Sequence, residues 1–285
     1  MLLVALAGLA ALVWGVADFS GGKATQRADA LCVVWLADLL SFPLLAAYVL
    51  RSGAVLDPAA LGWGFLAGVV GTAGSVVFYR AMACGAMTVV APVTSVTSAA
   101  VPVLVGLAVG ERPPGHALGG VGCALVAVAV VSATTPGPGT PVSRRQLVGP
   151  AVVAGLGFAL FMVFLAAAGH TTTGGLWSLL GAHAVGLLLG GTVLVRHHAA
   201  RRVWPRRRQL GWVGAAGLLD TAGSATYLVA SQHGDLSLVA PVAALYPVTT
   251  VLLALVIDHE RPGRRQVAGL LLAVAALHLV ARPGT

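Results

Sequence analysis

Apolar runs of near twenty residues alternate along the chain with short segments that hold glycines, prolines and charged residues. The hydrocarbon core of a bilayer is about 30 Å thick, and roughly 20 helical residues cross it. The runs lack the strict apolar–polar alternation of a membrane barrel, and an open sheet would leave backbone groups unpaired in lipid. The pattern therefore predicts an all-α membrane protein with ten transmembrane helices, near residues 2–19, 30–50, 60–80, 88–109, 117–134, 147–168, 175–195, 210–231, 237–257 and 266–281.

Composition agrees with this pattern. Of the 285 residues, 58% are hydrophobic and only 9% are charged, whereas soluble domains average roughly 25% charged residues. The segment before Trp14 has no basic n-region and no cleavage site, so we expect a retained first span rather than a signal peptide. The expected location is the cell (plasma) membrane, in which the lipid bilayer surrounds a multi-pass protein.

The second half of the sequence repeats the first at an offset of 149 residues. Single matches between alanine- and valine-rich stretches mean little, but tryptophan, proline and a Glu-Arg-Pro triplet also align under the same offset. We therefore predict two five-helix units, residues 1–134 and 147–285, joined by a proline-rich linker at 135–146. The aligned segments are Leu61–Trp63 with Leu210–Trp212, Thr72–Ser75 with Thr221–Ser224, Val90–Val93 with Val239–Val242, and Glu111–Pro113 with Glu260–Pro262.

An odd number of spans in each unit means that the second unit enters the membrane from the opposite side. The two repeats are then inverted, the layout of many secondary transporters, whose substrate site lies at the repeat interface. Loop charges favour the same topology: fourteen of the seventeen lysines and arginines fall on one side, with only Arg51, Arg112 and Arg282 opposite. The positive-inside rule then predicts that both termini are outside.

The net charge of +8 does not indicate nucleic-acid binding, because the basic residues sit in short loops. The richest, Arg196–Arg208, is expected to lie at anionic lipid. Three cysteines and eight histidines show no metal-ligand or redox spacing, and no glycine-rich phosphate loop occurs. We therefore expect no cofactor, no metal and no enzymatic activity.

The chain resembles the EamA-type members of the drug/metabolite transporter superfamily along essentially its whole length. The shared features are Trp14-Gly15, the Ala-Pro-Val that begins spans four and nine, the Gly-Glu-Arg-Pro after span four, and glycines in spans five and ten. The second half departs at His259, which replaces Gly110, and at Gly157-Phe158 in span six, which has no Trp-Gly pair. The resemblance implies ten helices around a central cavity, and export or exchange of small metabolites such as amino acids or drug-like amines.

Acidic residues inside spans are costly and are therefore functional candidates. Asp18 lies one helical turn after Trp14, and Asp38 lies three residues after Trp35. Asp18 also has a simpler interpretation, an interfacial acid paired with Lys23 or Arg27. Asp220 is replaced by Gly71 in the first repeat, which favours a role specific to this chain, although a hydrogen bond to a neighbouring helix would also explain it. Our hypothesis is that Asp220 or Asp38 carries a coupling proton or a cationic substrate.

Hydroxyl groups in spans four and nine are weaker candidates, because helical Ser and Thr often bond their own backbone. Four prolines predict that these two spans are bent and line the cavity. Glu111 and its neighbour Arg112 are expected to pair locally. The complete set of predicted substrate-binding residues is Trp14, Asp18, Trp35, Asp38, Tyr79, Thr94, Ser98, Phe158, Asp220, Ser224, Tyr227 and Tyr246.

These observations predict a secondary transporter that moves a small-molecule substrate, an amino acid, amine or drug-like solute, and works as an exporter by alternating access. A channel or facilitative pore is the alternative, because inverted repeats also build channels. An intramembrane enzyme would need a nucleophile, a base or a metal set whose residues converge, and the sequence offers no such cluster. A membrane scaffold or receptor without flux is less attractive, because the sequence shows no sizeable soluble domain. A coupling proton and a homodimer are the partners that the sequence leaves open.

Overall fold

The structure is a computed structural model that describes residues 2–83, 87–132, 144–171, 175–196, 203–257 and 264–281. The regular secondary structure of these residues is entirely helical. The helices are α1 (Leu2–Thr25), α2 (Ala30–Arg51), α3 (Pro58–Ala83), α4 (Met87–Ala108), α5 (Gly115–Ser132), α6 (Arg144–Gly169), α7 (Leu176–Arg196), α8 (Arg207–Gln232), α9 (Leu236–Ala243), α10 (Tyr246–Ile257) and α11 (Arg264–Ala281).

Within the part of the chain that the structure describes, five helical segments are long and apolar enough to cross a membrane by length and composition. They are Leu2–Thr25, Ala30–Arg51, Pro58–Phe78, Val148–Gly169 and Leu176–Arg196. Shorter apolar helices occupy Val93–Ala108, Gly115–Val130, Leu236–Thr250 and Val267–Val280. Many large side chains, including Leu44, Leu104 and Leu188, face outward, as expected for a protein surrounded by lipid.

The predicted span 237–257 consists of two helices. The first, α9, ends at Ala243 and α10 begins at Tyr246. Pro247 has no N–H to continue an α-helical ladder, and the Leu245 N–H instead donates to the Val242 carbonyl at 3.1 Å in a tighter turn. The bend that proline predicts in span nine is therefore a break, whereas α4 is continuous from Met87 to Ala108.

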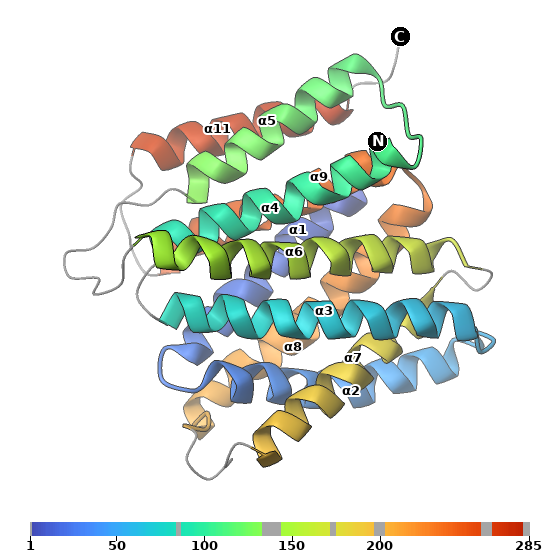
Figure 1. Cartoon of the computed structure of the whole chain (residues 1–285), viewed down its shortest axis with the longest axis vertical. Helices are drawn as coiled ribbons and strands as arrows, with labels where there is room; N and C mark the ends of the chain where they lie inside the picture. Colours follow the sequence, from blue (N-terminus) through green and yellow to red (C-terminus); the bar gives the residue numbers. More distant parts are fainter. Residues whose placement is uncertain are drawn as a thin grey trace.

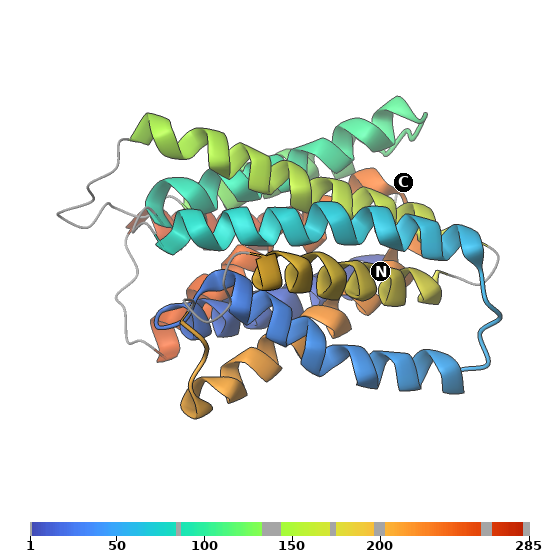
Figure 2. The ribbon, with the colours of Figure 1, turned by 60° about the horizontal axis from the view of Figure 1, so that its bottom comes forward.

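The main helix–helix contacts join residues of the first half to residues of the second. α1 packs on α8, α3 on α6 and α7, α4 on α6, and α5 on α11. Figures 1 and 2 show these helices lying side by side in the bundle. The buried core is rich in alanine, including Ala7, Ala10, Ala127 and Ala240. Small residues let helix backbones approach closely, which is how helices in lipid gain packing energy.

Two ends of the bundle can be distinguished by the loops that meet there. At the first, the Leu3 end, Leu3 packs against Gly234, and the Trp177 indole N–H donates to the Ala54 carbonyl at 3.3 Å. At the second, the Asp29 end, the Asp29 N–H donates to the Val203 carbonyl at 2.8 Å. The Leu3 end therefore holds the starts of α1, α7 and α9, and the Asp29 end holds the α1–α2 and α7–α8 connections.

Candidate functional site

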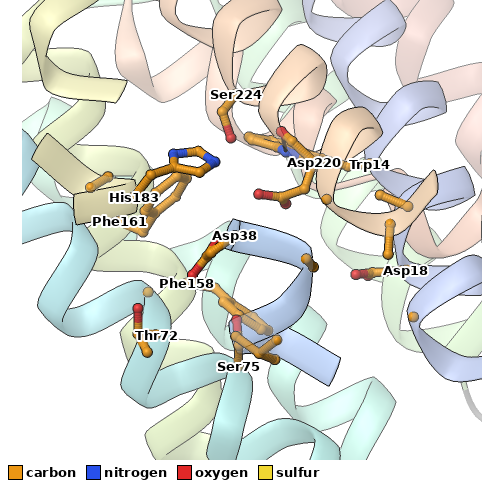
Figure 3. Close-up of a pocket in the computed structure, with 18 of the residues that line it drawn as sticks. Trp14, Asp18, Asp38, Thr72, Ser75, Phe158, Phe161, His183, Asp220 and Ser224 are labelled. Carbon is orange, nitrogen blue, oxygen red and sulfur yellow. Dashed lines mark hydrogen bonds between the residues drawn. The ribbon is translucent and has the colours of Figure 1, made fainter. Parts of the chain in front are cut away.

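A cavity of about 160 Å³ lies between helices from both halves of the chain. A water molecule needs about 10–15 Å³ in such a measure, so the cavity has room for on the order of ten non-hydrogen atoms. α1, α2, α3, α6, α7 and α8 form its walls, together with Tyr246 at the start of α10. The polar lining residues are Asp18, Asp38, Thr72, Ser75, His183, Asp220 and Ser224 (Figure 3).

Three carboxylates from three helices meet in this cavity. Figure 3 shows Asp38 and Asp220 pointing into the same space, with Asp18 at one side. Asp18 and Asp38 both interact electrostatically with the negative charge of Asp220. Among the described residues, none of the three carboxylate groups has a hydrogen bond or an ion pair, and the lining contains no lysine or arginine. Uncompensated charge in such a site is expensive, so a bound cation or protons must offset it.

Asp38 occupies its position because the facing residue has no side chain. A Cβ atom on Gly186 of α7 would overlap the Asp38 carboxylate and would lie 3.2 Å from the Thr72 hydroxyl oxygen. The absence of that atom lets α7 and α2 close around the acid, and the Asp38 side chain remains directed into the cavity (Figure 3).

Trp14 forms an aromatic wall beside Asp220. Its indole N–H donates to the backbone carbonyl of Asp220 at 3.3 Å, which fixes α1 against α8. The ring also contacts that of Tyr227, with centroids 5.4 Å apart. Phe158 and Phe161 of α6 add further aromatic surface to the lining. An aromatic face beside carboxylates is the pattern that binds organic cations.

His183 is a cavity residue that sequence reasoning missed. Its Nδ1 lies 2.9 Å from the Leu179 carbonyl, which only accepts, so Nδ1 carries a hydrogen. Its Nε2 lies 2.8 Å from the Thr221 hydroxyl oxygen, a contact that joins α7 to α8. The sequence shows only an isolated histidine, because its partner is 38 residues away and on another helix.

Ser224 supplies a buried polar group without a partner. Its side chain is 1% exposed, lines the cavity and lies one helical turn after Asp220. Among the residues that the structure describes, none is a hydrogen-bond partner of this hydroxyl oxygen. Because buried hydroxyl groups are almost always satisfied, this one indicates a ligand or water in the cavity.

Comparison with known families identifies the chain. The model of the EamA-like transporter family matches residues 1–133 and 146–282. The chain belongs to the EamA-like transporter family. Membership of this transporter family, together with the apolar helices, makes the chain a membrane protein that transports small solutes. The family is one of transporters and not of enzymes.

The crystal structure of another protein resembles that of this EamA-like chain. The two share 16% sequence identity and superpose with a TM-score of 0.79, over 98% of this chain and 97% of that one. At this identity the likeness concerns the fold alone. A search of curated proteins found no match.

Of the predicted site residues in this EamA-like chain, seven line the cavity: Trp14, Asp18, Asp38, Phe158, Asp220, Ser224 and Tyr246. The interfacial pairing considered for Asp18 is not seen, and the Lys23 ammonium lies 5.3 Å from the centroid of the Phe19 ring. The carboxylate of Asp220 is directed into the cavity and not toward a hydrogen bond with a neighbouring helix (Figure 3).

Four other predicted residues lie outside the lining and have structural partners. The Trp35 indole donates to the Leu187 carbonyl at 3.0 Å, and the Thr94 hydroxyl donates to the Ala151 carbonyl at 3.0 Å. The Ser98 hydroxyl donates within its own helix to Ser95, and the Tyr227 hydroxyl donates to the Met162 carbonyl at 3.2 Å. The contacts of Trp35, Thr94 and Tyr227 join neighbouring helices, whereas the Ser98 bond lies within α4. The side chain of Tyr79 lies outside the described residues.

Proposed function

We propose that this chain is a secondary transporter that carries a small organic cation across the cell membrane, as an exporter, by alternating access. The observation that carries this proposal is the group of three carboxylates without a cationic partner in one cavity. A protonated amine would neutralise one of these charges directly, and protons on the other acids would offset the rest. Release of the proton from the acid that pairs with the amine, as the amine binds, would couple the two fluxes.

The remaining lining narrows the class of substrate. Trp14, Phe158 and Phe161 present aromatic surface suited to the apolar part of an amine. The unpartnered Ser224 hydroxyl accepts one N–H of an ammonium group, and the carboxylates accept the others. A cavity with room for on the order of ten non-hydrogen atoms favours a compact primary amine over a large drug.

Alternating access follows from a duplicated, inverted architecture. We infer ten spans in two units, residues 1–134 and 147–285, with both termini outside and the basic loops inside. The Asp29 end of the bundle is then cytoplasmic. Asp18 and Gly21 lie near the end of α1, and Val33 lies near the start of α2, so the cavity lining extends toward that end. Lining residues that reach toward the cytoplasmic end support loading of the amine for export.

The test is flux in proteoliposomes that contain the purified full-length chain. Uptake of a radiolabelled small aromatic amine is expected to saturate with concentration, and unlabelled amine inside the vesicles should accelerate it. An imposed pH gradient should drive uptake against the amine gradient. A channel would instead give flux that does not saturate and shows no counterflow, and this result would refute the carrier proposal.

Ser224→Ala should weaken amine binding without lowering the stability of the protein. Because the hydroxyl has no partner among the described residues, its removal should leave the free energy of unfolding unchanged or raise it by up to about 1 kcal/mol. The thermal midpoint should therefore stay the same or rise. The apparent affinity for the amine should fall by about 10- to 150-fold, as expected for a lost hydrogen bond to a charged group. Ser231→Ala on the same helix is the control, since that hydroxyl donates to the Leu228 carbonyl at 2.8 Å outside the cavity. Equal amine affinity in Ser224→Ala and wild type would remove Ser224 from the site.

A further inference from the structure

The side chain of Glu111, which follows α4, reaches into the other half of the chain. Its Oε1 accepts the Leu236 N–H at 2.8 Å, and its Oε2 accepts the Ser237 N–H at 2.8 Å. Arg112 does not pair with this carboxylate but donates to the backbone carbonyls of Leu107 and Glu111. The expected local pairing is therefore replaced by a contact across 125 residues of sequence.

The two bonds cap the N-terminus of α9. The first N–H groups of a helix have no intrahelical acceptor, and a nearby negative charge stabilises them. Asp235, which precedes α9, is the residue type that usually supplies this cap, but its side chain makes no capping bond. A carboxylate from the first half performs this role for a helix of the second half.

The surrounding residues fit this contact closely. A Cβ atom on Gly106 would lie 2.9 Å from both the Glu111 carboxyl carbon and the Ser237 nitrogen, so α4 and α9 approach where α4 has no side chain. Ser237 is fully buried beneath the carboxylate. The contact lies at the Leu3 end of the bundle, where α9 begins, and the cavity lies between the two ends, with a lining that runs from Leu179 near the start of α7 to Gly21 and Val33 near the Asp29 end.

We propose that Glu111 is a latch that keeps the Leu3 end closed while the cavity opens toward the Asp29 end. The cavity can open at the Leu3 end only when the carboxylate releases α9. Residues 244–245 connect α9 to Tyr246, which lines the cavity. Glu111 does not touch the cavity, so it is a positioning residue. This inference rests on the proposed alternating access.

Asp235 provides a matched control. Partial burial and then the charge of Glu111 raise the pKa of its carboxyl, so the two acids lie near each other. Asp235→Asn removes the same charge from the same end of the bundle without breaking a bond to α9. Removal of this repulsion should leave the latch as it is or tighten it.

The experiment measures which end is open by cysteine labelling in a background with Cys32, Cys84 and Cys123 replaced by alanine. Ser237→Cys reports the Leu3 end, and Val34→Cys reports the cavity near the Asp29 end. A membrane-impermeant maleimide is applied from each side of the membrane. Glu111→Gln should speed labelling at residue 237 on the order of tenfold, the change expected for one lost charge-assisted bond, and should slow labelling at residue 34.

The reciprocal change separates a latch from a simple cap. If α9 merely frays in Glu111→Gln, labelling at residue 237 rises and labelling at residue 34 is unchanged, and this result overturns the latch. An equal effect of Asp235→Asn, or no effect of Glu111→Gln, also overturns it. Leu3→Cys replaces the first reporter if Ser237→Cys fails to fold. Labelling needs no substrate, so absence of wild-type counterflow would refute the proposed transport mechanism independently of these results.

Discussion

Replacement of Asp220 by asparagine is expected to reduce amine transport by about 30-fold or more. Asparagine keeps the shape of the side chain and removes the negative charge that interacts with Asp18 and Asp38. Loss of one partner of a buried charge pair costs about 2–5 kcal/mol, and about 2 kcal/mol corresponds to roughly 30-fold. The same change also removes a group that can exchange protons with the substrate, so the response of flux to a pH gradient should weaken.

The measurement is initial uptake of the labelled amine in proteoliposomes, as a function of amine concentration and of pH. Asp38→Asn should show a comparable loss. Asp57→Asn is the matched control: this carboxylate accepts the N–H groups of Ala59 and Ala60 at the start of α3, outside the cavity. It should lower stability and leave the amine affinity unchanged. Full, pH-dependent flux in both Asp220→Asn and Asp38→Asn would contradict the cation site.

Much of this cavity could be predicted because an acid inside an apolar run is costly in any membrane fold. That argument selects Asp18, Asp38 and Asp220 one at a time, and helical spacing adds Trp14 and Ser224. What the sequence does not show is that the three acids meet, since they lie on α1, α2 and α8. Their convergence depends on the packing of α1 and α2 against α8.

The residues that sequence reasoning missed have partners far away in the chain. His183 stands alone in its span, and only the fold brings it to Thr221. Glu111 lies beside Arg112 in sequence, which suggests a local pair, while its carboxylate caps α9 instead. Conversely, Trp35 and Tyr227 have the composition and spacing of binding residues but bond backbone carbonyls of neighbouring helices. Spacing predicts which residues share a helix face and not which helix that face meets.

The helices themselves were easier to predict than their packing. Apolar length predicts the bounds of the helices within a few residues, apart from α1, which continues to Thr25, and the bend predicted for span nine is a break between α9 and α10 next to Pro247. The glycine-rich composition indicates close helix contacts in general. It does not distinguish a glycine at a helix crossing from one that faces lipid, because both occur in similar apolar sequence.

Two glycines of α3 make this distinction measurable. Gly64→Ala should destabilise the protein by about 1–3 kcal/mol, the usual cost of an extra methyl group in a closely packed contact. The added Cβ would overlap the backbone of Ser178 on α7, with the Cα atom 2.6 Å away, so the two helices would have to separate.

Gly62→Ala, two residues earlier on the same helix, is the matched control. A Cβ atom at this position has no heavy atom within 4 Å, and alanine is the better helix former by about 0.8–1 kcal/mol in a helix interior. Thermal unfolding of the detergent-purified variants should therefore show a lower midpoint for Gly64→Ala and an unchanged or higher midpoint for Gly62→Ala. Equal midpoints in the two variants would mean that α3 and α7 do not cross at Gly64, and the α7 wall of the cavity, with His183 and Gly186, would lose its support.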